Sequence, residues 1–310
     1  MKEFIIYEKL MGSAFSLGIV CEDEKKANEC LEIGVNEIKR IETLLTEYKP
    51  ESVTSKINQQ PSGKPLQIDR EVFQIIKRSN NISALTQGDF DITASAFKRI
   101  YAFKNEDFVF PSKEIINQTL SNVGFDKLLL DEANSTITKL KPEMAISFNA
   151  IGKGYAADMV KKLWQKMDIH SGFVNASGDL CAFGTKADGS PWQIGIAHPD
   201  YKNKPMLFIP VHNQAVATSG DYEQYFMFQG KRYSHNINPK TGLPLHSLKS
   251  VSIISPSAEL SDALATAVYV MGERKGIEFV NQLPQTFAII IDQNNQVSMS
   301  KQLNYETNHL

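Results

Sequence analysis

The sequence predicts a fold of the α+β class (mixed α/β), with mostly antiparallel sheets and helices packed against them. Strand-like and helix-like segments alternate along the chain, without an internal repeat, a linker or a low-complexity stretch. Between Phe173 and Val211, strand segments follow one another through short turns, which favours antiparallel pairing over a doubly wound parallel sheet. The 310 residues can form a single domain over 1–310, with two closely packed lobes as an alternative.

The first part of the chain predicts two strands followed by three helices. Residues 3–7 and 14–21 have strand character, and apolar side chains alternate along the second segment. Over residues 24–45 the apolar side chains recur with a helical period, which predicts a long amphipathic helix. A loop then leads into a short helix that ends near Asn58, and a further helix is expected over 70–86.

The middle of the chain has a less regular pattern. Residues 98–110 form an aromatic-rich insertion without a clear period. After this insertion we expect a helix within 111–123, strands over 128–130, 135–139 and 146–148, and a helix over 155–167.

Strands dominate the last part of the chain. They are expected over residues 172–175, 180–184, 192–197, 205–211, 214–218, 225–228, 232–237, 251–254 and 287–291. Gln229-Gly230 between two of these strands predicts a tight hairpin turn. Helices are expected over 259–272 and 275–282, and the tail over 304–310 is expected to be mobile.

Composition excludes several classes of protein. A hydrophobic content of 42% and a charged content of 22% are ordinary for a globular domain. The net charge of −2 gives no electrostatic support for nucleic-acid binding. No apolar run approaches the ~20 residues that a membrane-spanning helix needs. The N-terminus lacks the long apolar segment of a secretory signal, which predicts a cytoplasmic protein. A periplasmic or membrane-anchored mature form, with its leader removed, is the alternative.

The cysteines and the common catalytic motifs point away from other enzyme classes. Cys21, Cys30 and Cys181 have no close CxxC spacing, and their odd number fits a reducing compartment or buried structural thiols. The sequence also lacks the GxSxG, P-loop and HExxH patterns. This argues against α/β-hydrolases, P-loop NTPases and zinc peptidases.

The stretch Thr218–Pro244 has the richest concentration of functional side chains. It combines a Ser-Gly-Asp turn, aromatic residues, a Gly-Lys-Arg loop and an Asn-Pro-Lys-Thr-Gly turn. A hairpin that carries Arg232, Ser234 and His235 beside such turns can cradle a polyanionic ligand. A polar surface hairpin is the alternative, since short motifs often occur without a function.

A second candidate site lies in the segment Asn149–Asp158. We expect a strand to end there and a helix to begin. A loop of small residues that contains Gly-Lys-Gly connects the two. A helix N-terminus presents free N–H groups and a positive dipole end, which suit phosphate, and Lys153 adds positive charge. The alternative is a tight turn with an exposed lysine.

Oxygen-bearing and aromatic side chains mark further candidate positions. Asp262 and Thr266 are four residues apart in a predicted helix, so they share one face, and oxygen ligands of this kind favour Mg²⁺. The alternative is that Ser261 or Asp262 only caps the helix. Tyr48 can stack on a flat ring or be a partly buried loop aromatic. Asp91 can bind a ligand or cap the next helix.

Seven segments, in order along the chain, resemble the motifs of the FAD:protein FMN transferase (ApbE) family. Seven motifs in the right order are not expected by chance, and together they span nearly the whole chain. The segments are Leu10–Ser13, Tyr48–Ser52, Gly88–Thr93, Asn149–Asp158, Val174–Asp179, Thr218–Gly242 and Ser261–Ala267. The chain departs from the usual motifs at Asn149-Ala150 (usually Gly-Gly), Gly152 (usually Ala), Ser177 (usually Gly) and Asn238 (often Asp).

The resemblance implies an ApbE-like fold with its active site in a cleft between two lobes. It also implies Mg²⁺-dependent transfer of FMN from FAD to a Thr or Ser hydroxyl of a target flavoprotein, with release of AMP. The acceptor would belong to a redox or ion-pumping complex. The alternatives are a Mg²⁺-dependent FAD pyrophosphatase that forms FMN and AMP, and a non-catalytic FAD-binding protein.

The resemblance also assigns roles to individual residues. The implied metal ligands are Asp262, Thr266 and a backbone carbonyl near Gly152. The implied catalytic residues are His235, as general base, and Asp262, through the metal; Asp179 or Asp262 is the competing base, although histidine titrates closest to neutral pH. We expect contacts to FAD from Met11, Tyr48, Asp91, Lys153, Asp179, Arg232, His235 and Thr241.

Overall fold

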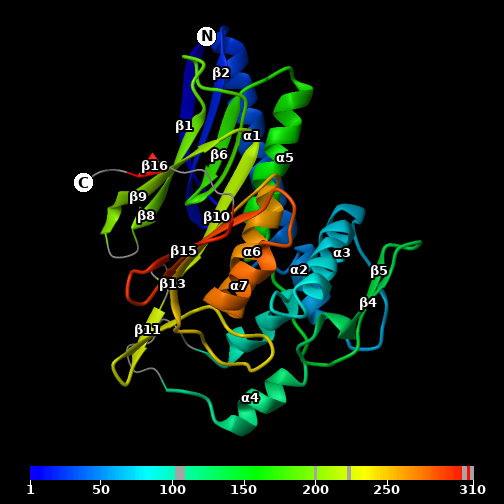
Figure 1. The fold of residues 1–310 in the computed structure, drawn as a ribbon. Coiled ribbons are helices and arrows are strands. Elements are labelled where there is room, and N and C mark those ends of the chain that lie inside the picture. The colour runs from blue at the N-terminus through cyan, green and yellow to red at the C-terminus, as the bar shows by residue number, and fades with distance from the viewer. Residues whose placement is uncertain (102–108, 199–200, 222–224, 302–305, 308–310) are drawn as a thin grey trace.

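The computed structural model of the chain describes residues 1–101, 109–198, 201–221, 225–301 and 306–307 (Figure 1). The largest sheet among these residues has eight strands, and every neighbouring pair is antiparallel. In spatial order the strands are β1 (Lys2–Leu10), β2 (Ser13–Cys21), β6 (Gly172–Ala176), β7 (Asp179–Phe183), β10 (Gln214–Gly220), β13 (Leu248–Ser255), β14 (Phe287–Asp292) and β15 (Val297–Met299). The predicted antiparallel α+β class is therefore confirmed.

Helices cover one face of this sheet and a smaller sheet covers the other. The helices are α1 (Glu24–Leu45), α5 (Gly152–Lys166), α6 (Ala258–Met271) and α7 (Glu273–Val280), as Figure 1 shows. The smaller sheet consists of β8 (Trp192–His198), β9 (Tyr201–Val211) and β16 (Glu306–Thr307). In β7, Cys181 and Phe183 pack on the helix side, whereas Leu180 and Ala182 pack towards the smaller sheet. This alternation is the two-residue period of a strand that is buried on both faces.

The other described elements lie beside and below α6 in Figure 1. A separate hydrophobic cluster that includes Phe97, Tyr101 and Val123 holds part of this region together. The Tyr101 hydroxyl donates to the carbonyl oxygen of Gly242 at 2.7 Å, which ties the segment after residue 234 to this cluster. The elements are α2 (Val53–Gln59), β3 (Leu66–Gln67), α3 (Arg70–Leu85), η1 (Ile92–Arg99), α4 (Lys113–Leu120), η2 (Phe125–Lys127), β4 (Leu128–Asp131), β5 (Thr136–Lys139), β11 (Tyr225–Phe228) and β12 (Lys231–Ser234).

Most predicted elements are present, and two differences concern the region of the site. The prediction of a strand over 146–148 is wrong, because this segment is irregular. The N–H of Ile146 donates to Asn58 Oδ1 at 2.8 Å, and Asn58 Nδ2 donates to the carbonyl oxygen of Ile146 at 3.0 Å. A side-chain amide thus replaces the strand partner. Helix α5 begins at Gly152 rather than at Tyr155, so the Gly-Lys-Gly segment lies inside the helix. The predictions for 98–110 and for the tail fall largely outside the described residues.

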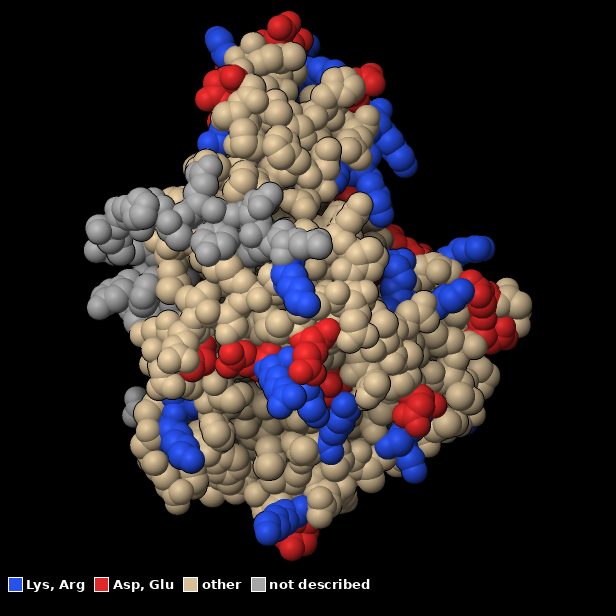
Figure 2. Space-filling model, viewed as in Figure 1, with Lys and Arg blue, Asp and Glu red and all other residues tan. Residues whose placement is uncertain are grey.

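The surface agrees with the balanced composition. Figure 2 shows basic and acidic side chains lying next to one another on the face drawn. None of the helices in the described ranges combines the length and the apolar character needed to cross a bilayer.

Candidate active site

Two tight turns place their tips at the same end of the main sheet. Met11-Gly12 joins β1 to β2 and Ser177-Gly178 joins β6 to β7, and all four residues have positive φ. Such two-residue turns match the twist of antiparallel strands. Because Phe15 pairs with Ala176, both turns lie at one end of the sheet. The main chain of Met11 is held there by a hydrogen bond from its N–H to Glu42 Oε2 at 3.0 Å.

The N-terminus of α5 meets α6 beside these turns. No side chain caps the start of α5, but the N–H of Gly154 donates to Asp262 Oδ2 of α6 at 3.1 Å. The two helices are so close that a Cβ on Gly154 would lie 2.2 Å from the carbonyl oxygen of Ala258. Glycine is therefore required at position 154 if Asp262 is to reach the first turn of α5.

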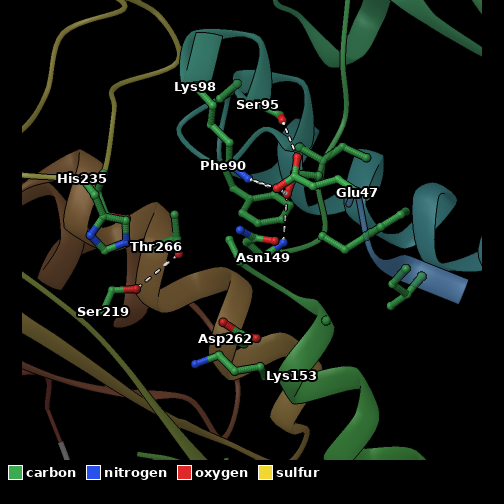
Figure 3. Close-up of a pocket in the computed structure, with 18 of the residues that line it drawn as sticks. Glu47, Phe90, Ser95, Lys98, Asn149, Lys153, Ser219, His235, Asp262 and Thr266 are labelled. Atoms are coloured by element: carbon green, nitrogen blue, oxygen red, sulfur yellow. Dashed lines mark hydrogen bonds and ion pairs between the residues drawn. The ribbon is translucent and has the colours of Figure 1, made fainter. Parts of the chain in front are cut away.

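These elements border a cavity of about 590 Å³, within the usual range for small-molecule sites. One side, which we call the helix half, consists of Gly152, Lys153, Asp179, Ser219, His235, Asp262 and Thr266. The other side, the loop half, consists of Glu47, Tyr48, Phe90, Ser95, Lys98 and Ser147. Figure 3 shows residues of both halves around the same space.

The helix half contains deeply buried charges. Lys153 Nζ lies 2.5 Å from Asp179 Oδ2, and Asp179 is only 4% exposed. Asp179 also accepts from the N–H of Thr218 at 3.2 Å, so β7 and β10 both fix its position. Asp262 is 6% exposed. Charges in such a low-dielectric place act more strongly on a ligand than charges on the surface do.

Oxygen atoms from α6 and β10 gather next to Asp262. Thr266 Oγ1 lies 3.2 Å from Ser219 Oγ, and Figure 3 shows this pair between His235 and Asp262. Ser257, rather than Ser261 or Asp262, caps α6 by accepting from the N–H of Leu260. Capping of α6 therefore does not account for Asp262 or Thr266. Among the described residues, no group of three or more His, Cys, Asp or Glu side chains could form a metal site by itself.

The loop half is more open, and it combines irregular segments with η1, which carries Ser95 and Lys98. Glu47 pairs with Lys98, and Lys98 Nζ donates to Ser147 Oγ at 3.0 Å. Glu47 also accepts from Ser95 Oγ at 3.5 Å. The Lys98 side chain is 40% exposed and Tyr48 is 81% exposed. An exposed tyrosine at a cavity rim offers a ring face to a ligand at little cost in desolvation.

A sequence profile described as the ApbE family matches residues 11–291 of the chain. The chain belongs to the ApbE family. It is 28% identical to a protein of Haemophilus influenzae named FAD:protein FMN transferase, over 93% of this chain and 86% of that one. An Escherichia coli protein of the same name is 29% identical over 90% and 81% of the two chains.

Solved structures of ApbE proteins have the same fold. The apbe protein of Thermotoga maritima superposes with a TM-score of 0.89 at 30% identity, and 97% of each chain is covered. The flavinyl transferase ApbE of Pseudomonas stutzeri, in its apo form, gives a TM-score of 0.86 at 26% identity, covering 97% of this chain and 95% of that one. The predicted ApbE-like fold is confirmed.

Most of the predicted site residues of this ApbE-family chain line the same cavity. Segments that are far apart in the sequence bring them together there. Those that line the cavity are Met11, Tyr48, Asp91, Gly152, Lys153, Asp179, His235, Asp262 and Thr266. Their roles towards a ligand stay predictions.

Arg232 and Thr241 are not among the residues that line the cavity. Arg232 instead donates to the carbonyl oxygen of Asp221 at 3.0 Å, and its guanidinium lies 3.9 Å from the ring centre of Tyr225. Thr241 belongs to the turn at Asn238, whose side chain accepts from its N–H. Both residues are therefore engaged in local structure beside the site.

Asp91 lines the cavity, but its carboxylate has a structural role. It accepts from the N–H and the hydroxyl of Thr93, at 2.8 and 2.6 Å, and from the N–H of Phe125 at 2.8 Å. It is thus the N-cap of η1, which was the alternative interpretation. Burial raises the pKa of Asp91, and these hydrogen bonds oppose that shift.

The sequence interpretation missed several residues that border the cavity. Glu47, Lys98 and Ser147 come from segments without a periodic pattern, so their meeting could not be inferred. Ser219 had a signal, since it belongs to the Thr-Ser-Gly-Asp motif, although the turn predicted there is wrong: Ser219 and Gly220 lie in β10 and pair with β13. Its hydrogen bond with Thr266 makes it a further candidate for the ligand site.

Proposed function

We propose that this chain is a Mg²⁺-dependent FAD:protein FMN transferase. It would move FMN from FAD to a Thr or Ser hydroxyl of a target flavoprotein, with release of AMP. Membership of the ApbE family supports this, as do the relatives named FAD:protein FMN transferase. The observation that carries the proposal is the start of α5, with Lys153, beside Asp262 and Thr266 in one cavity.

The pyrophosphate of FAD suits the start of α5. The N–H groups of Gly152 and Gly154 already donate to the carbonyl oxygen of Phe148 and to Asp262, but the helix dipole still favours negative charge at this helix end. Lys153 adds a positive charge that its pairing with Asp179 holds at the cavity wall. Met11 and Tyr48 supply apolar and aromatic surface for the flat rings.

The residues around Asp262 fit a Mg²⁺ ion. They offer one carboxylate, hydroxyl oxygens from Thr266 and Ser219, and backbone carbonyls near Gly152. Mg²⁺ in phosphoryl-transfer sites commonly takes one or two carboxylates from the protein and the remaining ligands from phosphate and water. When bound, the ion would neutralise the pyrophosphate and polarise the phosphorus that is attacked.

In the reaction, the acceptor hydroxyl oxygen attacks the FMN-side phosphorus. A new P–O bond forms, the bond to the bridging oxygen breaks, and AMP leaves with that oxygen. The hydroxyl proton passes to a base, and this assistance typically accelerates such steps by roughly 10²–10⁴-fold. We assign the base to His235, because it lines the cavity and histidine is the side chain that commonly titrates near neutral pH.

The proposed function is tested by mass spectrometry of a flavoprotein acceptor that has been incubated with the protein, FAD and Mg²⁺. A mass gain of one FMN, with AMP released and EDTA abolishing both, is the expected result. Free FMN and AMP without an adduct would instead identify a pyrophosphatase. If FAD stays intact with every acceptor tried, the chain would instead be a non-catalytic flavin-binding protein.

A further inference from the structure

The carboxylate of Asp158, in the second turn of α5, binds the first turn of the neighbouring helix α6. Asp158 Oδ2 accepts from Ser257 Oγ at 2.7 Å and from the N–H of Glu259 at 3.0 Å. Its Oδ1 accepts from the N–H of Ala258 at 3.0 Å. A helix N-terminus is normally capped by a residue of its own chain segment. Here a carboxylate on another helix supplies a second cap, and Asp158 is buried.

A second hydrogen-bond contact joins the same two helices, but here the donor belongs to α5 and the acceptor to α6. The N–H of Gly154 in α5 donates to the carboxylate of Asp262 in α6 at 3.1 Å. Gly154 and Asp158 are four residues apart on α5, and Ala258 and Asp262 are four residues apart on α6. Each pair spans about 6 Å of helix, so the two bonds fit one alignment of the helices. A slip by one residue would move Asp262 by about 1.5 Å and turn it by roughly 100°.

We propose that Asp158 is a positioning residue that fixes this alignment and so holds Asp262 and Thr266 at the cavity. The proposal rests on the proposed function, since it concerns the site for FAD and Mg²⁺. Asp158 does not line the cavity among the described residues, so its effect must pass through α6. The absence of a Cβ at Gly154 permits the close approach, and Asp158 then sets which residues of α6 face the start of α5.

The substitution Asp158→Asn tests this inference with little change in shape. The amide keeps one acceptor oxygen, but its NH₂ group would face donors of Ser257 and α6, so at least one bond is lost. We expect kcat for FMN transfer to fall at least tenfold, with the KM for the acceptor unchanged. We also expect the rise in melting temperature on adding FAD and Mg²⁺ to be halved, a readout that needs no turnover.

Asp23→Asn is the matched control, because Asp23 caps α1 by accepting from the N–H groups of Lys25 and Lys26. This control should retain both the wild-type kcat and the ligand-induced rise. If Asp158→Asn only lowered the melting temperature of the ligand-free protein, with wild-type kcat and ligand-induced rise, Asp158 would merely stabilise the fold.

A second variant keeps the test decisive if Asp158→Asn does not fold. Ser257→Ala removes one donor of the same cap, and its ligand-induced rise should be smaller than that of Asp23→Asn. Equal rises would overturn the proposal. A wild-type protein that gains stability with FAD and Mg²⁺ but modifies no acceptor would count against the proposed function alone. A wild-type protein without any such gain would overturn both.

Discussion

The two halves of the cavity differ in how their charges are held. In the helix half, Asp179 and Asp262 are almost fully buried, and each is fixed by a backbone N–H from a regular element. In the loop half, Lys98 is 40% exposed and pairs with Glu47, whose side chain is 14% exposed. Buried charges on rigid elements are pre-organised for catalysis, whereas exposed pairs are screened by water. The comparison indicates that the chemistry belongs to the helix half and that the loop half mainly admits and orients ligands.

The largest effect is expected for Asp262→Ala. The change removes the only carboxylate that we assign to the metal and leaves the N–H of Gly154 without this acceptor. Transfer should fall by about 10³-fold, the upper range for losing one electrostatic group in an active site. The measurement is kcat across a Mg²⁺ titration, with circular dichroism to confirm folding. Normal Mg²⁺-dependent turnover would show that the metal assignment is wrong.

A smaller effect is expected for His235→Ala. Without a general base, transfer should slow by roughly 10²-fold, at the low end of the usual contribution of such groups. FAD binding should change little, because we assign the pyrophosphate to α5. Single-turnover transfer measured beside FAD titration separates these effects. A variant with wild-type transfer would move the role of base to Asp179.

Lys153→Met should act mainly on binding. Loss of a charged donor should weaken FAD binding about tenfold, consistent with the ~1.5–3 kcal/mol of hydrogen bonds to charged groups. Flavin fluorescence measured at two salt concentrations provides the affinity. The melting temperature must be followed as well, because Asp179 loses its partner in this variant. Unchanged affinity in a folded variant would place the pyrophosphate elsewhere.

The smallest effect is expected for Lys98→Met in the loop half. Because Lys98 is 40% exposed, we expect its ion pair to contribute about 0–1 kcal/mol, as surface pairs do, so transfer should stay within about 5-fold of wild type. The same kcat and KM assay applies. If this variant lost as much activity as Asp262→Ala, the contrast between the two halves would be broken, and Glu47 and Lys98 would belong to the chemistry.

The same contrast explains what the sequence could predict. Asp262 and Thr266 were found from helical spacing, and Lys153 from a Gly-Lys-Gly segment at a helix start, because regular elements impose regular patterns. Glu47 and Lys98 were missed, because Glu47 lies in a loop and Lys98 in the short helix η1, 51 residues further along the chain, and no local sequence pattern predicts their contact.

Most of the fold followed from periodicity, and the failures were local. The long helix over 24–45 and the hairpin at Gln229-Gly230 have the predicted bounds and turn. The strand expected over 146–148 failed because the amide of Asn58 satisfies Ile146 from a distant part of the chain. The capping of α6 by Asp158 was not predicted for the same reason, because the two partners are 100 residues apart in the sequence.

The order of strands in the main sheet also has a consequence during synthesis of the chain. Strand β2 pairs with β6, so Leu17 lies beside Val174. At about 5–20 residues per second, roughly 8–30 s separate the translation of these two residues. Until then β2 lacks its partner strand β6, and nascent chains that end before Gly172 are expected to bind hydrophobic dyes and chaperones. Pulse-labelled nascent chains that already resist protease at that length would contradict this expectation.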